Sequence, residues 1–218
     1  MKVIQNLVPT SKYNIKCPNS MVPEFIVVHN TANDVSAANE ISYMISNNNQ
    51  VSFHYAIDDK EIVQGIPENR NAWHAGDGAS GKGNRKGLSI EICYSKSGGK
   101  RFEEAEKLAA KFIAFKLKEK GWAIDKVKKH QDFSGKYCPH RTLDMGWQRF
   151  LNMVQAELNT LKGVDKVTDK NTPSSWAKEA WEWAKKEGIT DGTDPKGTVT
   201  REQLAAMLYR YHKQVNKK

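Results

Sequence analysis

Two short apolar runs, residues 25–30 and 86–95, constrain the fold of this chain most strongly. The first, FIVVHN, is rich in β-branched residues and has no helical period, which predicts a buried strand ending at His29. In the second, KGLSIEICYS, isoleucines alternate with Glu91 and Cys93, which predicts another buried strand. Any fold for this chain must therefore place two strands inside a sheet.

The segments around these runs predict a hairpin and several helices. Residues 51–66 contain two strand-like runs around Asp-Asp-Lys, a hairpin signal. A helix is expected after Ser36, which suits an N-cap. A longer helix is expected over 102–121, acidic at its start, basic at its end and closed by Gly121. Another is expected to be capped by Asp144, with one apolar face made of Trp147, Phe150, Leu151, Val154 and Leu158.

Strands that alternate with helices predict an α/β domain over residues 1–161. Residues 162–173 are polar, lack an apolar period and predict a linker. Residues 174–218 predict two helices, the second opened by a capping box of Thr200 and Gln203. About 45 residues form only a marginal core, so we expect this module to dock, to self-associate or to present a binding face. Its first helix contains three of the six tryptophans: Trp176, Trp181 and Trp183.

The charge and composition narrow the class of protein. The hydrophobic content of 39% is too high for a disordered chain. A net charge of +9 attracts polyanions such as nucleic acid, anionic membrane or a cell wall, but the basic residues are scattered, so a solubilising surface is an equal alternative. The sequence has no membrane span and no apolar segment of a secretory signal. Three cysteines far apart favour synthesis in a reducing compartment.

The loop 129–141, KHQDFSGKYCPHR, concentrates residues that bind metals. His130 and Cys138 lie eight residues apart in it, and His29 ends a strand, where clefts open. Two histidines and a cysteine can give Zn²⁺ three ligands and leave the fourth position to water, the open arrangement of a catalytic zinc site. From spacing alone, an accidental grouping stays the alternative.

A zinc hydrolase also needs a carboxylate that takes the proton of the water and a donor for the developing oxyanion. Glu91 lies in an otherwise apolar strand, so it either faces solvent or points into a site, and the alternation supports both. Lys136 lies two residues before Cys138. A lysine in an exposed loop is ordinarily only solvated.

Five motifs carry a resemblance to a known family. In chain order they are FIVVHNTA, SFHYAIDDKEIVQGIPE, AWHAG, GLSIEICY and HQDFSGKYCPH. Their order and spacing resemble the zinc-dependent N-acetylmuramoyl-L-alanine amidases, most closely the amidase domains of endolysins from phages of Gram-positive bacteria. The resemblance covers about residues 5–160. It implies a central mixed β-sheet flanked by helices, the fold of peptidoglycan-recognition proteins, and hydrolysis of the amide between N-acetylmuramic acid and L-alanine in peptidoglycan.

The resemblance implies a role for each residue that matches a family motif. His29, His130 and Cys138 match the family's Zn²⁺ ligands. Glu91 matches the glutamate that many members use as a general base, and Lys136 matches the lysine that stabilises the oxyanion.

Two further residues, Asn30 and His74, are implied as substrate contacts. Some members carry a tyrosine just before the histidine of the second motif. This chain has Phe53 there, which has no hydroxyl, and this strengthens the case for Glu91. His54 itself is expected to be a packed strand histidine.

The C-terminal helices resemble a single S-layer homology motif, through the tryptophan-bearing helix, the GITDGT turn and the VTREQLAAML helix start. Such modules usually come in threes and bind secondary cell-wall polymers. The resemblance implies binding of such a polymer, and a merely stabilising helical hairpin is the alternative. The oligomeric state stays open between a monomer and association through these helices.

Two other functions compete with the enzyme. A non-catalytic peptidoglycan-binding recognition protein often lacks the cysteine ligand, and Cys138 together with Glu91 argues against it. A nucleic-acid binder with a structural zinc predicts clustered basic residues and a fourth protein ligand, which the sequence does not show. We therefore expect peptidoglycan as partner, and neither nucleic acid nor membrane. The protein is expected to be made in the cytoplasm without a signal peptide and to act at the bacterial cell wall after release.

Overall fold

The computed structural model describes residues 1–163 and 172–215. The chain divides into two compact units, Met1–Lys162 and Gly163–Lys218. Most of the predicted linker, 162–173, lies outside the described residues. Within the described ranges, no helix is long and apolar enough to cross a membrane.

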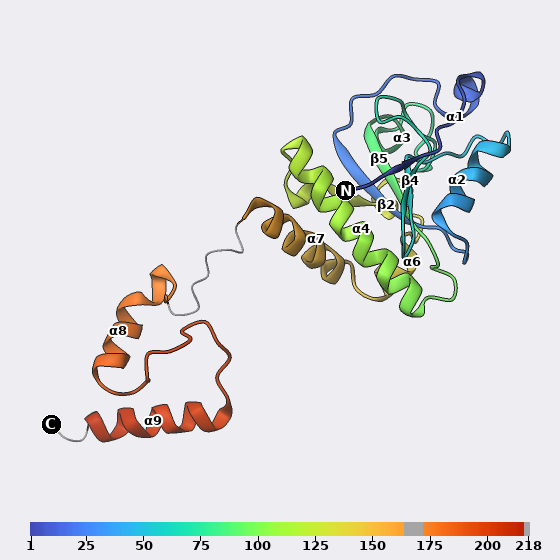
Figure 1. Ribbon diagram of the computed structural model, residues 1–218. Coiled ribbons are helices and arrows are strands. Elements are labelled where there is room, and N and C mark those ends of the chain that lie inside the picture. Colours follow the sequence, from blue (N-terminus) through green and yellow to red (C-terminus); the bar gives the residue numbers. More distant parts are fainter. Residues whose placement is uncertain (164–171, 216–218) are drawn as a thin grey trace. The chain divides into compact units, whose positions relative to one another are not determined.

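A mixed sheet of six strands forms the centre of the N-terminal unit (Figure 1). In chain order the strands are β1 (Ile4–Gln5), β2 (Phe25–Asn30), β3 (Tyr55–Ile57), β4 (Ile62–Gln64), β5 (Gly87–Ile92) and β6 (Val127–Lys129). Their order across the sheet is β1-β4-β3-β5-β2-β6. Only β3 and β4 are antiparallel neighbours, which confirms the predicted hairpin. The two predicted buried strands, β2 and β5, pair with each other inside the sheet.

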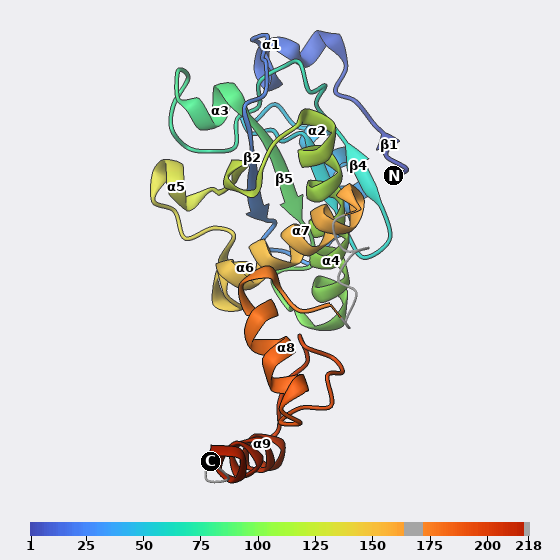
Figure 2. The ribbon, with the colours of Figure 1, turned by 90° about the vertical axis from the view of Figure 1, so that its left-hand side faces the viewer.

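Helices cover both faces of this sheet (Figures 1 and 2). Helix α2 packs against β3 and β4 on one side, whereas α4 packs against β3 and β5 on the other and is itself covered by α7. The helices of the unit are α1 (Tyr13–Lys16), α2 (Ala37–Ser46), α3 (Lys82–Lys86), α4 (Gly99–Lys120), α5 (Gln131–Ser134), α6 (His140–Asp144) and α7 (Trp147–Lys162). Short 3₁₀ helices cover Thr10–Lys12 and Ile124–Lys126.

Two of the predicted helix signals are confirmed. Ser36 caps α2, because its side-chain oxygen accepts a hydrogen bond of 3.3 Å from the backbone N–H of Asn39. Gly121 ends α4 in the left-handed conformation, with φ 67°. Helix α4 begins at Gly99, before the predicted start at residue 102, so Glu103 and Glu104 lie in the second turn and not in the first.

The predicted cap of the last helix of this unit is wrong. Asp144 is the final residue of α6, and its carboxylate accepts a hydrogen bond of 2.7 Å from the Tyr137 hydroxyl. Gly146 then adopts φ 103°, a conformation that side chains disfavour, and α7 begins only at Trp147. The apolar face of α7 is as predicted, with Phe150, Val154 and Leu158 buried in the core.

A group of charged side chains ties α4 to the segment after β4. Glu68 accepts hydrogen bonds or ion pairs of 2.7–2.8 Å from Tyr55, Lys116 and Lys120. Burial by itself raises the pKa of Glu68, but these three donors overcome it and hold the pKa at about 2. The ionised carboxylate therefore contributes to the stability of the folded unit.

The C-terminal unit consists of α8 (Lys178–Lys186) and α9 (Arg201–Val215), preceded by a 3₁₀ turn at Ser175–Ala177. The predicted capping box is confirmed. The Thr200 hydroxyl accepts a hydrogen bond of 3.1 Å from the N–H of Gln203, whose side chain accepts one of 2.8 Å from the N–H of Thr200.

An open cavity of about 530 Å³ lies between α8, α9 and the connection that joins them. Trp181, Ile189 and Arg210 contribute to its lining, and Ile189 is buried. Arg210 also donates a hydrogen bond of 3.2 Å to the carbonyl of Ile189, which joins α9 to the start of the connection. This small unit thus has a hollow between its helices.

Candidate metal centre and its pocket

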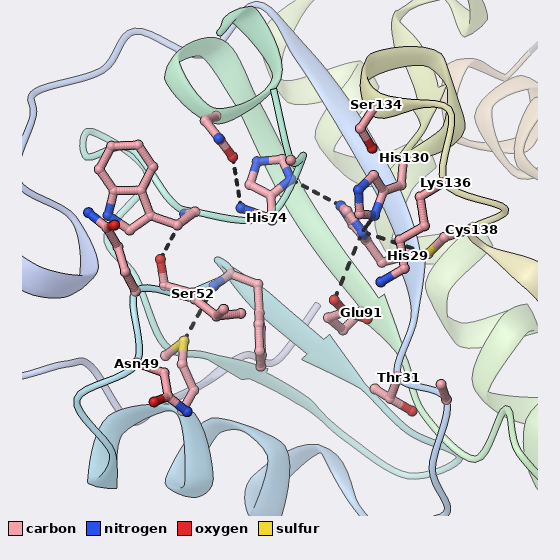
Figure 3. A pocket seen from close by; sticks show the side chains of 18 of the residues that line it. His29, Thr31, Asn49, Ser52, His74, Glu91, His130, Ser134, Lys136 and Cys138 are labelled. Carbon is pink, nitrogen blue, oxygen red and sulfur yellow. Dashed lines mark hydrogen bonds and ion pairs between the residues drawn. The ribbon is translucent and has the colours of Figure 1, made fainter. Parts of the chain in front are cut away.

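A cavity of about 740 Å³ lies at the carboxyl ends of β2 and β6, beside α2 (Figure 3). Helix α2 and the segment around residues 73–79 contribute its walls. The structure brings every predicted site residue to this one cavity: His29, Asn30, His74, Glu91, His130, Lys136 and Cys138.

The two histidines of the predicted metal set come from neighbouring strands. β2 and β6 are parallel and pair Val28 with Lys129, so His29 near the end of β2 and His130 just after β6 lie side by side. Their Nδ1 atoms are 3.0 Å apart. Cys138 follows α5 in a loop that returns to the same place, and its Sγ lies 3.9 Å from His29 Nδ1.

The three side chains fit a zinc ion. One donor atom from each of His29, His130 and Cys138 lies within 4.8 Å of the other two. A tetrahedral zinc with bonds of about 2.0–2.3 Å requires donor separations of about 3.3–3.6 Å. A shift of the thiol towards the histidines and a slight separation of the two imidazoles, whose Nδ1 atoms are 3.0 Å apart, satisfy this. All three side chains are buried, with exposed fractions of 2%, 6% and 5%. Nitrogen, nitrogen and sulfur are the donors that zinc prefers, and three of them leave one position open.

Burial sets the protonation of these groups. It holds the pKa of His29 and of His130 below the usual value, so both rings are neutral and can offer a lone pair. Burial and the charge of Glu91 raise the pKa of the Cys138 thiol to about 11. A metal ion would have to displace the thiol proton on binding, which couples its affinity to pH.

Glu91 points into the cavity from the middle of the sheet. It pairs with His29 across β5 and β2, and its carboxylate oxygen lies 4.0 Å from His29 Nδ1. Its neighbours Ile90 and Ile92 belong to the hydrophobic core, so the alternation of β5 directs the carboxylate into the site and not to open solvent. Burial first, and the charge of Glu40 second, raise the pKa of Glu91 to about 8, against the opposing effect of Lys136.

Lys136 enters the cavity from the loop between α5 and Cys138. Its side chain points towards the histidines and Glu91 in Figure 3. The positive charge of Lys136 lowers the pKa of His29, of His130 and of Glu91, in addition to the larger effect of burial on each. The residue is exposed, so the ammonium can meet a ligand in the cavity.

The Asn30 side chain has its hydrogen bonds within the protein. Its Oδ1 accepts from the backbone N–H groups of Arg141 and Thr142 at 3.0 and 3.2 Å, at the start of α6. Its Nδ2 donates to the carbonyl of His29 at 3.1 Å and to the Thr142 hydroxyl at 3.4 Å. The asparagine therefore positions α6 next to the metal ligands, and its contact with substrate stays a prediction.

The remaining histidines differ in their surroundings. His54 is fully buried and hydrogen-bonded to the Ser89 hydroxyl at 2.9 Å, which confirms that it is a packed histidine. His140 lies 3.3 Å from the carbonyl of Ser95. His74 is buried, and its Nδ1 lies 3.0 Å from Nε2 of His29, so the predicted substrate contact of His74 stays a prediction.

One wall of the cavity was missed by the sequence analysis. Tyr43 of α2 and the loop that follows it line the cavity. The fully buried Lys16 fixes this loop, because its ammonium donates to Asn47 Oδ1 at 3.0 Å and to the carbonyls of Asn49 and Val51 at 2.6 and 3.1 Å. The only distinctive feature of this loop in the sequence is a run of asparagines, which does not indicate the wall of a cavity.

A comparison with known protein families decides which family this site belongs to. Residues 19–141 match the family model of the N-acetylmuramoyl-L-alanine amidases. The chain belongs to this family. The matched stretch includes His29, Glu91, His130 and Cys138, so the amidase motif and the clustered side chains coincide.

Similar proteins support the same assignment. This amidase is 52% identical over 220 residues to the N-acetylmuramoyl-L-alanine amidase CwlA of Bacillus subtilis (strain 168), covering 96% of this chain and 80% of the relative. It is 61% identical over 175 residues to XlyB of the same strain, covering 80% of this chain and 55% of the relative. The structure of PlyL matches with a TM-score of 0.69 and 52% identity, covering 71% of this chain and 97% of that chain. The predicted fold class and enzyme class are thereby confirmed.

Proposed function

We propose that this amidase hydrolyses the amide bond between N-acetylmuramic acid and L-alanine in peptidoglycan and depends on zinc for it. The convergence of His29, His130 and Cys138 beside Glu91 in one cavity carries the proposal. The activity named for CwlA and XlyB supports the choice of bond. A recognition protein without activity is not favoured, because this chain has the complete set of ligands and the carboxylate next to them.

Different residues of the site bind the metal, transfer the proton and stabilise the oxyanion. His29, His130 and Cys138 would hold the ion, which would acidify a water molecule and polarise the substrate carbonyl. Glu91 accepts a proton from the water molecule while the oxygen of that water bonds to the carbonyl carbon. Lys136 donates a hydrogen bond to the oxyanion that develops on the carbonyl oxygen. When the carbon–nitrogen bond breaks, Glu91 returns the proton to the departing amino group of L-alanine.

The raised pKa of Glu91 fits this role. A carboxylate with a pKa of about 8 would be largely protonated at neutral pH. A divalent cation bound by the neighbouring ligands would favour the ionised form, and the ammonium of Lys136 favours it too. With an ion bound, the carboxylate would be available as the base that general-base catalysis requires.

Mass spectrometry of digested cell walls tests this function. Purified walls are incubated with the protein, with the protein plus a chelator, and with the chelated protein to which zinc is returned. We expect new free amino termini of L-alanine in the first and third samples and none in the second. New reducing sugar ends, cleavage within the stem peptide, or full activity in the chelator would contradict the proposal.

We further propose that the C-terminal unit binds a secondary cell-wall polymer, so that the amidase acts at the bacterial cell wall. The cavity of about 530 Å³ between α8 and α9, with an aromatic and a basic residue in its lining, supports this. The test is sedimentation with purified walls of the full chain and of a chain ending at residue 163. We expect the full chain to sediment more strongly, and equal sedimentation would remove this proposal. The absence of a signal peptide stays a prediction.

A further inference from the structure

The contact between His74 and His29 affects which ring nitrogens of the metal site carry protons. Each imidazole offers one nitrogen as a lone pair and carries its proton on the other. The Nδ1 atoms of His29 and His130 face each other, and Cys138 lies beside that of His29, so both must be free of protons to bind an ion. The protons of the two rings must then sit on the two Nε2 atoms.

The second nitrogen of His29 meets a partner that can accept this proton. His29 Nε2 lies 3.0 Å from His74 Nδ1, and the ring planes are almost perpendicular, at 87° (Figure 3). If His29 donates from Nε2, His74 must accept at Nδ1 and carry its own proton on Nε2. The backbone of Gly83 and Gly87 favours a proton on the His74 ring, although its buried Nε2 has no hydrogen bond of standard geometry among the described residues. One assignment of protons is thus consistent across all of these rings.

The backbone of His74 is held in place by a buried side chain. Asn84, 4% exposed, accepts hydrogen bonds of 2.8 Å from the N–H groups of both His74 and Ala75. Its Nδ2 donates to the carbonyl of Gly78 at 3.0 Å, which closes the loop on itself. The acceptor that meets His29 is therefore fixed by the fold before any ion binds.

The same loop faces the second histidine ligand. The carbonyl of Ala75 lies close to the His130 ring and favours a proton on it. The Nε2 atom of His130 is buried and has no hydrogen bond of standard geometry in the described part of the chain. His74 thus lies beside the ring of His29, and Ala75 lies beside the ring of His130.

We infer that His74 is a positioning residue that accepts the Nε2 proton of His29 and thereby holds the Nδ1 lone pair of His29 ready for zinc. The inference rests on the zinc-dependent function proposed above. It assigns to His74 a role in metal binding that needs no contact with substrate. Partners of this kind in other metal sites typically change metal affinity by about 10–100-fold when removed.

Two nearly isosteric variants separate the hydrogen bond from the packing. In His74→Asn, a side-chain oxygen can take the place of Nδ1 and accept the same proton. In His74→Leu, a methyl group occupies that place and accepts nothing. The dissociation constant for zinc is measured on metal-free protein by competition with a chromophoric chelator, without substrate, and thermal melting of each metal-free variant reports whether it folds.

We expect His74→Leu to bind zinc about 10–100-fold more weakly than the wild type, and His74→Asn to retain most of the affinity. Equal affinity of His74→Leu and the wild type would overturn the inference. An equal loss in both variants would overturn it too, because packing alone would then explain the effect. A role limited to substrate binding predicts no change in zinc affinity in either variant.

The tautomer of His29 in the metal-free wild type gives a second test that needs no variant and no zinc. Histidine labelled with ¹⁵N distinguishes a protonated from an unprotonated ring nitrogen by its chemical shift. We expect the proton of His29 on Nε2, and a proton on Nδ1 would overturn the inference. If the wild type failed to bind zinc at all, the proposed function would fall, and this spectrum would still decide the hydrogen bond.

Discussion

The cavities of the two units are built in different ways. The N-terminal cavity is about 740 Å³ and has its chemical groups buried at the ends of strands in a six-stranded sheet. The C-terminal cavity is about 530 Å³ and lies between two helices. Among the described residues of that unit, Ile189 is the one buried hydrophobic residue. In that unit Trp176 and Trp183 are 88% and 48% exposed. Catalysis needs side chains fixed within fractions of an ångström, whereas a polymer can be bound by a surface with little core.

In the proposed function, the metal and the reaction belong to the N-terminal cavity. Substitutions there should abolish chemistry and leave wall binding intact. Changes in the second unit should do the reverse. The predictions that follow are ordered from the largest expected effect to the smallest.

Replacement of a metal ligand should have the largest effect. Cys138→Ser removes the sulfur donor, and we expect zinc affinity to fall by more than the roughly 100-fold typical of an outer partner, with loss of hydrolysis. Atomic absorption of the purified variant measures the zinc content. Cys93→Ser is the matched control, because Cys93 is equally buried but belongs to the hydrophobic core. A zinc-loaded, active Cys138→Ser protein would contradict the ligand set.

Glu91→Gln keeps the size of the side chain and removes the base. We expect zinc to remain bound and the turnover rate to fall by about 10²–10⁴-fold. The measurement is the rate of release of L-alanine amino termini from walls, with metal content determined on the same sample. If turnover stayed within a few-fold of the wild type, another group would have to take the proton.

Lys136→Ala should reduce turnover by about 10²–10³-fold, because it removes one donor to the oxyanion. Zinc content should not change, since the ammonium is not a ligand. Lys129→Ala, in the same region but paired with Asp132 outside the cavity, is the control. Wild-type lysis by Lys136→Ala would exclude the proposed role of the lysine.

Glu68→Gln should destabilise the N-terminal unit in a manner that depends on pH. The folded pKa of about 2 lies below the usual 4.5, so the carboxylate stabilises the fold above pH 4.5, and this stabilisation disappears as the pH falls towards 2. We expect a loss of up to about 3 kcal/mol at pH 7 and a smaller difference between variant and wild type at pH 3.

Urea unfolding at the two pH values measures this effect. Glu24→Gln is the control, because Glu24 also pairs with a lysine, Lys86, at 2.9 Å, but on the exposed surface. Equal destabilisation by both variants, or a Glu68→Gln effect that does not depend on pH, would contradict the assigned pKa.

Removal of residues 164–218 should have the smallest effect on chemistry. We expect the turnover rate on soluble muropeptides and the melting temperature of the N-terminal unit to be unchanged, because the two units are compact separately. Turnover on intact walls should fall, because binding to the polymer is lost. If turnover on the soluble substrate dropped as well, the division of labour between the units would be wrong.

The sequence predicts the elements of the N-terminal unit well, because its signals are local. The β-branched run before His29, the cap at Ser36 and the left-handed Gly121 all depend on neighbouring residues. Asp144 fails for the same reason. Its side chain could cap a helix, but Gly146, with a positive φ, separates it from the first turn of α7. A single sequence does not reveal the φ of that glycine.

The site shows the limit of local signals more clearly. His29 and His130 are 101 residues apart, and only the pairing of β2 with β6 brings them together. The alternation of residues in β5 places Glu91 on the opposite face of the sheet from Ile90 and Ile92, but it does not indicate which face borders the cavity. The contacts of His74 with His29 and of Lys16 with the loop after α2 have no signature in the sequence at all, because each joins distant segments through a buried polar contact.

A zinc titration of the metal-free protein tests the central claim most directly. Hydrolysis is followed by the appearance of L-alanine amino termini as zinc is added in steps. The account predicts that activity is absent at the start, rises linearly, and reaches its plateau at one zinc per chain in the wild type, with no rise in Cys138→Ser. Activity before any zinc is added, or a plateau at a different ratio, would contradict a single ion held by His29, His130 and Cys138.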